Sequence, residues 1–212
     1  MTTAATLRSL LLDAHRGSFP PVDGGWTRIA PWRPGLGAVI AFTGHAVMAV
    51  DDDVEDHDLA ELGVDGYGGA HDPRVVLTLA GAAGWIDSLD AVLLCAPPTS
   101  RACTLVERRD LAGHPRAQLA TKVRDDVRVF GHQNVRDQSL VTVARGLGGL
   151  TELGIETDGR PDAVRLLREA AMLGPSGEPV VASVAPGNAR ALRTFLSAGF
   201  RPVASVQLFQ RC

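Results

Sequence analysis

Several residue types are scarce in this sequence, and each shortage removes a class of protein. The 212 residues include three cysteines, Cys95, Cys103 and Cys212, which are odd in number and form no CxxC pair. A disulfide framework and a structural zinc site therefore do not fit, and a reducing compartment is expected. Lys122 is the only lysine, and 21 basic residues face 24 acidic ones, for a formal net charge of −3. This charge gives no general attraction to nucleic acid or to an anionic membrane.

Long apolar runs and a leader peptide are not evident either. The longest mostly apolar stretch, 36–50, is interrupted at Thr43, Gly44 and His45 and is too short to span a bilayer. The helix-like segment 6–15 is amphipathic and lacks the basic start of a leader peptide. With 45% hydrophobic and 21% charged residues, the chain has the composition of a globular protein with a sizeable core. We therefore expect a cytoplasmic protein that binds neither membranes nor nucleic acid.

Turn signals and two prolines divide the chain into two parts. Pro97 and Pro98 break any regular element, so we place a soft boundary after residue 96. The predicted domains are an N-terminal segment over 1–96, a candidate degenerate half-domain that packs on the rest, and a second domain over 97–212. The elements predicted in the first part are strands over 37–42, 45–50 and 91–96, the first two forming a hairpin, and helices over 6–15 and 73–85.

The second part alternates strand and helix patterns. Strands joined by hairpins, followed by a strand–helix–strand–helix–strand run, favour a mixed sheet with helices on its faces. The predicted fold class is therefore α/β or α+β. The predicted strands are 104–108, 127–132, 140–145, 151–157, 179–185 and 203–209, and the predicted helices are 115–124, 161–173 and 188–198.

The segment 184–200 carries a recognisable pattern. Asn188 follows Pro-Gly, Ala191 comes three residues later, and the predicted helix ends at Gly199-Phe200. A capped structural helix explains these residues by itself about half the time. The spacing and the element order nevertheless resemble the C-terminal signature of the GCN5-related N-acetyltransferase (GNAT) superfamily, over roughly the second half of the chain. The resemblance implies a mixed, mostly antiparallel central sheet flanked by helices, here with an N-terminal extension, and acetyl-CoA as cosubstrate.

GNAT proteins hold the CoA pyrophosphate at the start of a helix, in a loop of pattern Gln/Arg-x-x-Gly-x-Gly/Ala, and two stretches compete for this role. The stretch 145–150 has the Arg and the first Gly, but a strand pattern follows it, so it is interpreted as a hairpin turn. The stretch 158–163 precedes a predicted helix but departs from the pattern, and a charged contact from Arg160 could compensate. The resemblance thus implies CoA contacts at Thr157, Asp158, Gly159, Arg160, Asp162, Ala163, Asn188 and Phe195.

Acetyl transfer to an amine needs a general base, because an alkylamine is almost wholly protonated near pH 7. Glu156 ends the strand before the predicted phosphate loop, and Glu152 shares its face in the period-2 pattern. Both are candidate catalytic residues, and two solvated carboxylates on a polar strand face are the equal alternative. If the strand splays there, the Thr157 N–H becomes a candidate donor to the thioester oxygen.

A general acid is not evident. Phe195 occupies the position where many GNAT members have a tyrosine, and the only tyrosine is Tyr67. A CoA thiolate can leave without strong acid help, because a thiol has a pKa of about 8.5. We therefore predict direct transfer from acetyl-CoA to the amine of an unidentified acceptor in a ternary complex. The alternative is a degenerate member that binds acyl-CoA or a protein partner without turnover. The histidines show no metal-ligand spacing, so no metal site is expected. The chain is a candidate homodimer.

Overall fold

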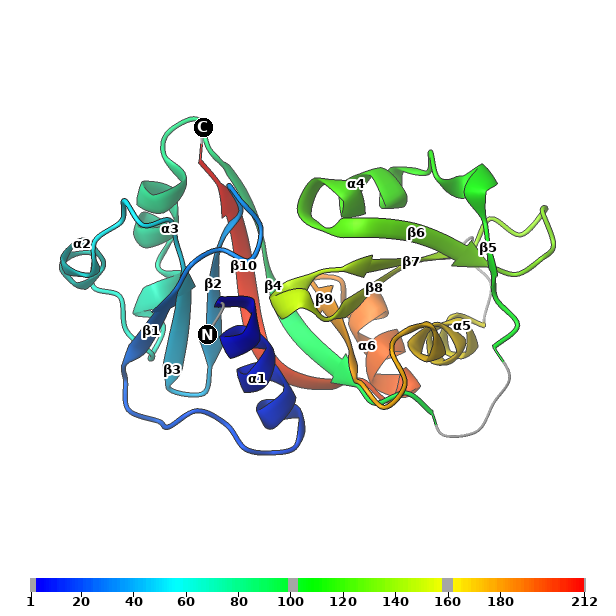
Figure 1. The fold of residues 1–212 in the computed structure, drawn as a ribbon, viewed down its shortest axis with the longest axis horizontal. Helices are drawn as coiled ribbons and strands as arrows, with labels where there is room; N and C mark the ends of the chain where they lie inside the picture. The colour runs from blue at the N-terminus through cyan, green and yellow to red at the C-terminus, as the bar shows by residue number, and fades with distance from the viewer. Residues whose placement is uncertain (1–2, 99–102, 158–161, 212) are drawn as a thin grey trace. The chain divides into compact units, whose positions relative to one another are not determined.

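The computed structural model describes residues 3–98, 103–157 and 162–211 (Figure 1). The chain forms two compact units: Met1–Val92 with Val203–Cys212 make unit 1, and Leu93–Pro202 make unit 2. The last strand therefore groups with the first half of the chain. The predicted division into domains over 1–96 and 97–212 stays a prediction.

Unit 1 is built on strands in the order β1-β3-β2-β10-β4. β2 and β3 form the predicted antiparallel hairpin, with Phe42 opposite His45, while β1 runs parallel to β3. Leu7 and Leu11 of the first helix are fully buried, which confirms its amphipathic pattern. The elements are α1 (Thr3–His15), β1 (Trp26–Ile29), β2 (Gly37–Phe42), β3 (His45–Ala49), α2 (Asp56–Glu61), η1 (Gly69–His71), α3 (Pro73–Ala80), β4 (Trp85–Cys95) and β10 (Arg201–Gln210).

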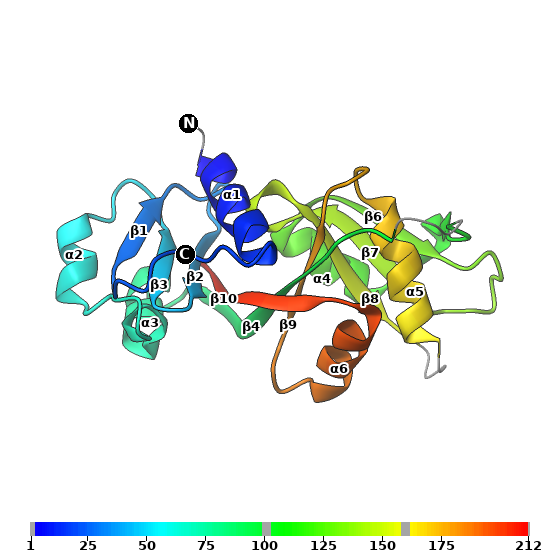
Figure 2. The ribbon, with the colours of Figure 1, turned by 90° about the horizontal axis from the view of Figure 1, so that it is seen from below.

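Unit 2 is built on strands in the order β9-β8-β7-β6-β5. Neighbours from β5 to β8 are antiparallel, and β8 and β9 are parallel, as the helical crossover between them requires. Figures 1 and 2 show α4 on one face of these strands and α5 and α6 on the other. The elements are β5 (Val106–Glu107), η2 (Arg109–Leu111), α4 (Pro115–Val123), β6 (Asp125–Gly131), β7 (Leu140–Arg145), η3 (Leu147–Gly149), β8 (Thr151–Glu156), α5 (Ala163–Ala170), η4 (Ala171–Leu173), β9 (Val180–Val184) and α6 (Ala189–Ala198).

The predicted fold class is confirmed: the strands of each unit pair in a mixed, mostly antiparallel arrangement and are flanked by helices. Two boundaries in unit 1 differ from the prediction. The helix expected over 73–85 ends at Ala80, because Gly81 leaves helical geometry at φ +79°. β4 consequently begins at Trp85, before the apolar run from which it was predicted. None of the helices in the described part of the chain is long and apolar enough to cross a membrane.

Candidate functional site

The carboxyl end of β8 and the first turn of α5 are the centre of the candidate site. Glu156 is the last residue of β8, lies opposite Leu140 of β7, and is exposed. Thr157 follows and is half-buried. α5 begins at Ala163 after Asp162, so the predicted helix is confirmed with a later start. The predicted contacts Asp158, Gly159 and Arg160 lie outside the described residues.

Glu152 is buried and does not share a solvated face with Glu156. Its side chain is among the buried charged groups, at 5% exposure. One carboxylate oxygen, Oε1, lies 2.6 Å from Arg124 Nη2 and accepts a hydrogen bond from Ser183 Oγ at 3.0 Å. The other, Oε2, accepts from the Leu147 N–H at 3.0 Å. The prediction that both glutamates lie on a solvated face of β8 is therefore wrong for Glu152, because Arg124 crosses this face and neutralises the Glu152 carboxylate. These contacts leave Glu152 with a structural task, while Glu156 remains open to solvent.

The stretch 145–150 is a hairpin turn, as predicted, and it joins β7 to β8. The Gly146 N–H donates to the Leu150 carbonyl at 2.9 Å. Arg145 points its guanidinium at the carboxylates of Asp125 and Asp126. A strand and not a helix follows the turn, so no helix dipole is available there for a phosphate.

Asn188 is the amino-terminal cap of α6. Its Oδ1 accepts a hydrogen bond from the Ala191 N–H at 3.1 Å. Gly199 ends the helix with φ +105°, a left-handed conformation that glycine adopts without strain. The capped-helix interpretation of this segment is thus confirmed, and the exposed Asn188 side chain has a defined structural role. Its contact with CoA stays a prediction.

Phe195 lies in the core of unit 2. Its side chain is 3% exposed, and its ring packs edge-on against Phe200 with ring centroids 5.0 Å apart. The predicted contact of Phe195 with CoA stays a prediction. The helix turns this residue inward because Phe195 and Ala198 form its buried stripe.

We expect Phe195→Tyr to lower the free energy of unfolding by about 1–3 kcal/mol, because the added hydroxyl is buried without a partner. Thiol release from acetyl-CoA should not become faster. Urea denaturation and a thiol assay on the same variant check both points. Phe19→Tyr is the matched control, since Phe19 is 46% exposed and should change stability by no more than about 0.5 kcal/mol. If the variant is as stable as the wild type and releases thiol faster, the result would show that the side chain at position 195 lies at the site of thiol release.

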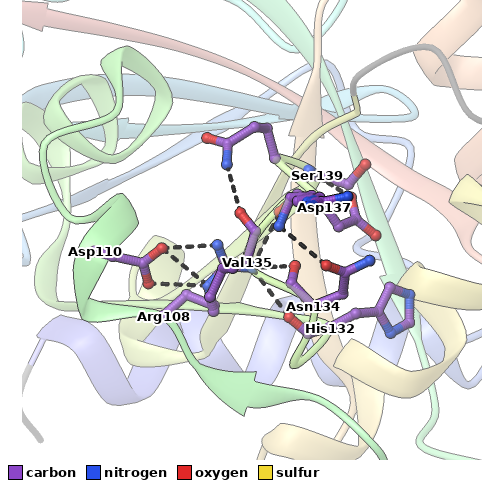
Figure 3. A network of polar contacts seen from close by, with 9 residues as sticks. Arg108, Asp110, His132, Asn134, Val135, Asp137 and Ser139 are labelled. Carbon is purple, nitrogen blue, oxygen red and sulfur yellow. Dashed lines mark hydrogen bonds and ion pairs between the residues drawn. The ribbon is translucent and has the colours of Figure 1, made fainter.

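A buried arginine holds the loop between β6 and β7 (Figure 3). Arg108, 3% exposed, donates through Nη1 to the carbonyl oxygens of His132, Asn134 and Asp137 at 3.0–3.3 Å. Its Nε and Nη2 donate to the Asp110 carboxylate, and this hydrogen bonding lowers the pKa of Asp110. The loop is thereby fixed at the sheet edge where β8 ends.

His132 is the residue of this loop that meets the candidate site. Its Nε2 lies 3.7 Å from the Asp162 carboxylate at the start of α5. Sequence reasoning missed both this pair and the role of Arg108, because their partners are distant in the chain and no local spacing indicates them. In the sequence, His132 is only one of the histidines that show no metal-ligand spacing.

Other polar features of unit 2 lie apart from the predicted residues. A hollow of about 220 Å³ is lined by residues of η2, α4 and β6, among them Arg109 and Arg128, and by none of the predicted site residues. Burial raises the pKa of the Cys95 thiol, so this thiol is not an activated nucleophile. Among residues 3–98, 103–157 and 162–211, no group of three or more His, Cys, Asp or Glu side chains could hold a metal ion.

No protein-family model and no curated protein sequence matches this chain. Several solved structures resemble it, and three of them are described here. A protein from Novosphingobium aromaticivorans assigned to the GNAT family of acetyltransferases is 20% identical over 62% of this chain and 69% of its own, with a TM-score of 0.40. A GCN5-related N-acetyltransferase from Kribbella flavida is 14% identical over 100% of this chain and 96% of its own, with a TM-score of 0.44. A Drosophila protein is 12% identical over 79% of this chain and 60% of its own, with a TM-score of 0.42.

The element order of unit 2 agrees with the order predicted from the sequence. Its strands and helices follow one another in the order that the sequence resemblance implied, from β6 through β7, β8, α5 and β9 to α6.

Proposed function

We propose that unit 2 transfers an acetyl group from acetyl-CoA to an amine by direct attack. One arrangement carries the proposal: β8 ends at the exposed carboxylate of Glu156, and the chain returns through α5 to the parallel strand β9. Ligands of such crossovers bind outside the carboxyl ends of the parallel strands, and helix amino termini bind phosphates. The Glu156 carboxylate and the amino terminus of α5 thus both follow the carboxyl end of β8. A carboxylate together with a helix terminus that can bind phosphate suits an acyl donor that carries phosphate groups.

The first turn of α5 fits a phosphate group. The Asp162 side chain makes no hydrogen bond to this turn, so this carboxylate does not cap the N–H groups of the first residues, Ala163 among them. The Asp162 carboxylate lies instead near His132. These N–H groups would hold the pyrophosphate, and Asn188 and Thr157 would contact the rest of the donor. When bound, acetyl-CoA supplies an activated thioester.

Glu156 is the proposed general base. The acceptor amine must lose a proton before attack, a deficit of roughly 4 kcal/mol at pH 7 for an ordinary alkylamine. The exposed Glu156 carboxylate takes this proton, directly or through one water, and returns it to solvent. The backbone N–H of Thr157 is the proposed donor to the thioester oxygen.

Acetyl-CoA should raise the free energy of unfolding by about 2.7 kcal/mol when present at 100 times its dissociation constant. Thermal unfolding with acetyl-CoA, CoA and ATP measures this binding, and release of free thiol with a panel of amines measures turnover. Binding together with amine-dependent thiol release supports the enzyme. Binding of acetyl-CoA without release of thiol with any amine of the panel favours a non-catalytic acyl-CoA-binding domain of the same fold. No stabilisation by acetyl-CoA or CoA would contradict both.

A further inference from the structure

The backbone carbonyl of Ile155 accepts hydrogen bonds from an arginine side chain. In a regular sheet, a backbone N–H of a neighbouring strand would be the donor. The hairpin bond from the Gly146 N–H to the Leu150 carbonyl sets the alternation along β8. The backbone groups of Ile155 consequently face away from β7, on the side of β9. β8 and β9 pair with Glu152 opposite Val181, and the described residues of these strands form no pair further along.

Arg116 of α4 donates the hydrogen bonds to this carbonyl. Its Nε and Nη2 both donate to the Ile155 oxygen, at 3.1 and 3.0 Å. Two charged donors on one oxygen make a stronger contact than the single N–H···O bond of a strand neighbour. The end of β8 is thus held by a side chain at the position where the pairing with β9 has stopped.

Local structure brings Arg116 to this place. α4 begins at Pro115, and the His114 Nδ1 accepts a hydrogen bond from the Arg116 N–H at 3.1 Å, which caps the helix. Gly154 leaves the face of β8 open. A Cβ added there would lie 2.6 Å from Thr142 Oγ1 and 3.8 Å from Arg116 Cδ. The close contact of such a Cβ would be with Thr142, while Arg116 would lie at an ordinary van der Waals distance from it.

We infer that Arg116 is a positioning residue, which fixes the end of β8 and so the carboxylate of Glu156, the next residue in the chain. This inference rests on the proposed function for its catalytic consequence. Without Arg116 the Ile155 carbonyl turns to water, and the last residues of β8 fray. Small misplacements of a catalytic group cost up to about 100-fold in rate, so Arg116→Ala should lower kcat by about 10- to 100-fold while the KM for acetyl-CoA stays within about threefold.

The test compares Arg116→Ala, Arg116→Lys and the control Arg109→Ala, an exposed arginine of the same unit. Amide hydrogen exchange at residues 155–157, measured by NMR, reports the strand end whether or not the protein turns over. We expect exchange there to speed up by about tenfold or more in Arg116→Ala, with the middle of β7 unchanged. Arg116→Lys, which keeps one charged donor, should recover part of the protection and part of kcat, and Arg109→Ala should match the wild type.

Three outcomes would overturn the inference. One is exchange at 155–157 that stays within twofold of the wild type in Arg116→Ala. Another is loss of protection throughout β7 and β8, which would make Arg116 a general fold residue. The third is local fraying with kcat unchanged. A wild type that releases no thiol with any amine would instead contradict the proposed function, and the exchange measurement would still decide whether Arg116 holds the end of β8.

Discussion

Glu152→Ala lowers the free energy of unfolding by about 3–5 kcal/mol, because it leaves the guanidinium of Arg124 buried without its carboxylate. The substitution also removes the acceptors of the Leu147 N–H and the Ser183 hydroxyl. Urea denaturation monitored through unit 2 measures the loss. The matched control is Glu107→Ala, whose carboxylate pairs with the largely exposed Arg128. Its ion pair should contribute no more than about 1 kcal/mol.

A double variant separates the ion pair from the rest of this network. Replacing both Arg124 and Glu152 by leucine removes two buried charges together, and such replacements often cost little once the volume is filled. We expect the double variant to be more stable than Glu152→Ala. A loss of under about 1 kcal/mol in Glu152→Ala would mean that Arg124 finds solvent or another partner, and that the pair does not anchor the turn between β7 and β8.

From the proposed role of Glu156, we expect Glu156→Gln to lower kcat by about 10²- to 10⁴-fold, the usual cost of losing a general base. Glutamine keeps the shape of the side chain but takes no proton at neutral pH. Binding of acetyl-CoA should be unchanged, because the proposed phosphate contacts come from α5 and not from this carboxylate. Thiol release at saturating amine and thermal unfolding with acetyl-CoA check the two statements.

Glu55→Gln is the control for this experiment. Glu55 is an exposed carboxylate in unit 1 that makes no side-chain cap to α2, so the same chemical change there should leave kcat unaltered. If Glu156→Gln retains activity within a few-fold, the proton passes to water or to another group, and His132 beside Asp162 is the next candidate to replace.

Local patterns were sufficient to predict most elements. The hairpin of β2 and β3 follows from two β-rich runs around Thr43-Gly44, and Gly44 adopts φ +72° in that turn. Asn188 and Gly199 mark the two ends of α6 by chemistry that acts within a few residues. The stretch 145–150 was separated from a phosphate loop because a strand pattern follows it.

The candidate site was only partly predictable for the same physical reason. Glu156 could be placed at a strand end, because a strand end is a local feature. The burial of Glu152 could not be predicted, because it depends on Arg124 crossing from α4. Arg108 and Arg116 are ordinary arginines in the sequence, and each acquires its role from carbonyl oxygens that other strands and loops bring to it.

The sequence by itself thus determined the element order, the class of fold, the capped helix before β10 and an acidic residue at the end of β8, because all of these follow from periodicity and from contacts over a few residues. Only the tertiary structure decided which of the two strand glutamates is neutralised, that Phe195 faces the core, and that the last strand groups with the first half of the chain. These outcomes depend on long-range packing: a buried charge needs a partner and an aromatic ring needs a cavity to fill, and both are supplied by segments far away in the chain.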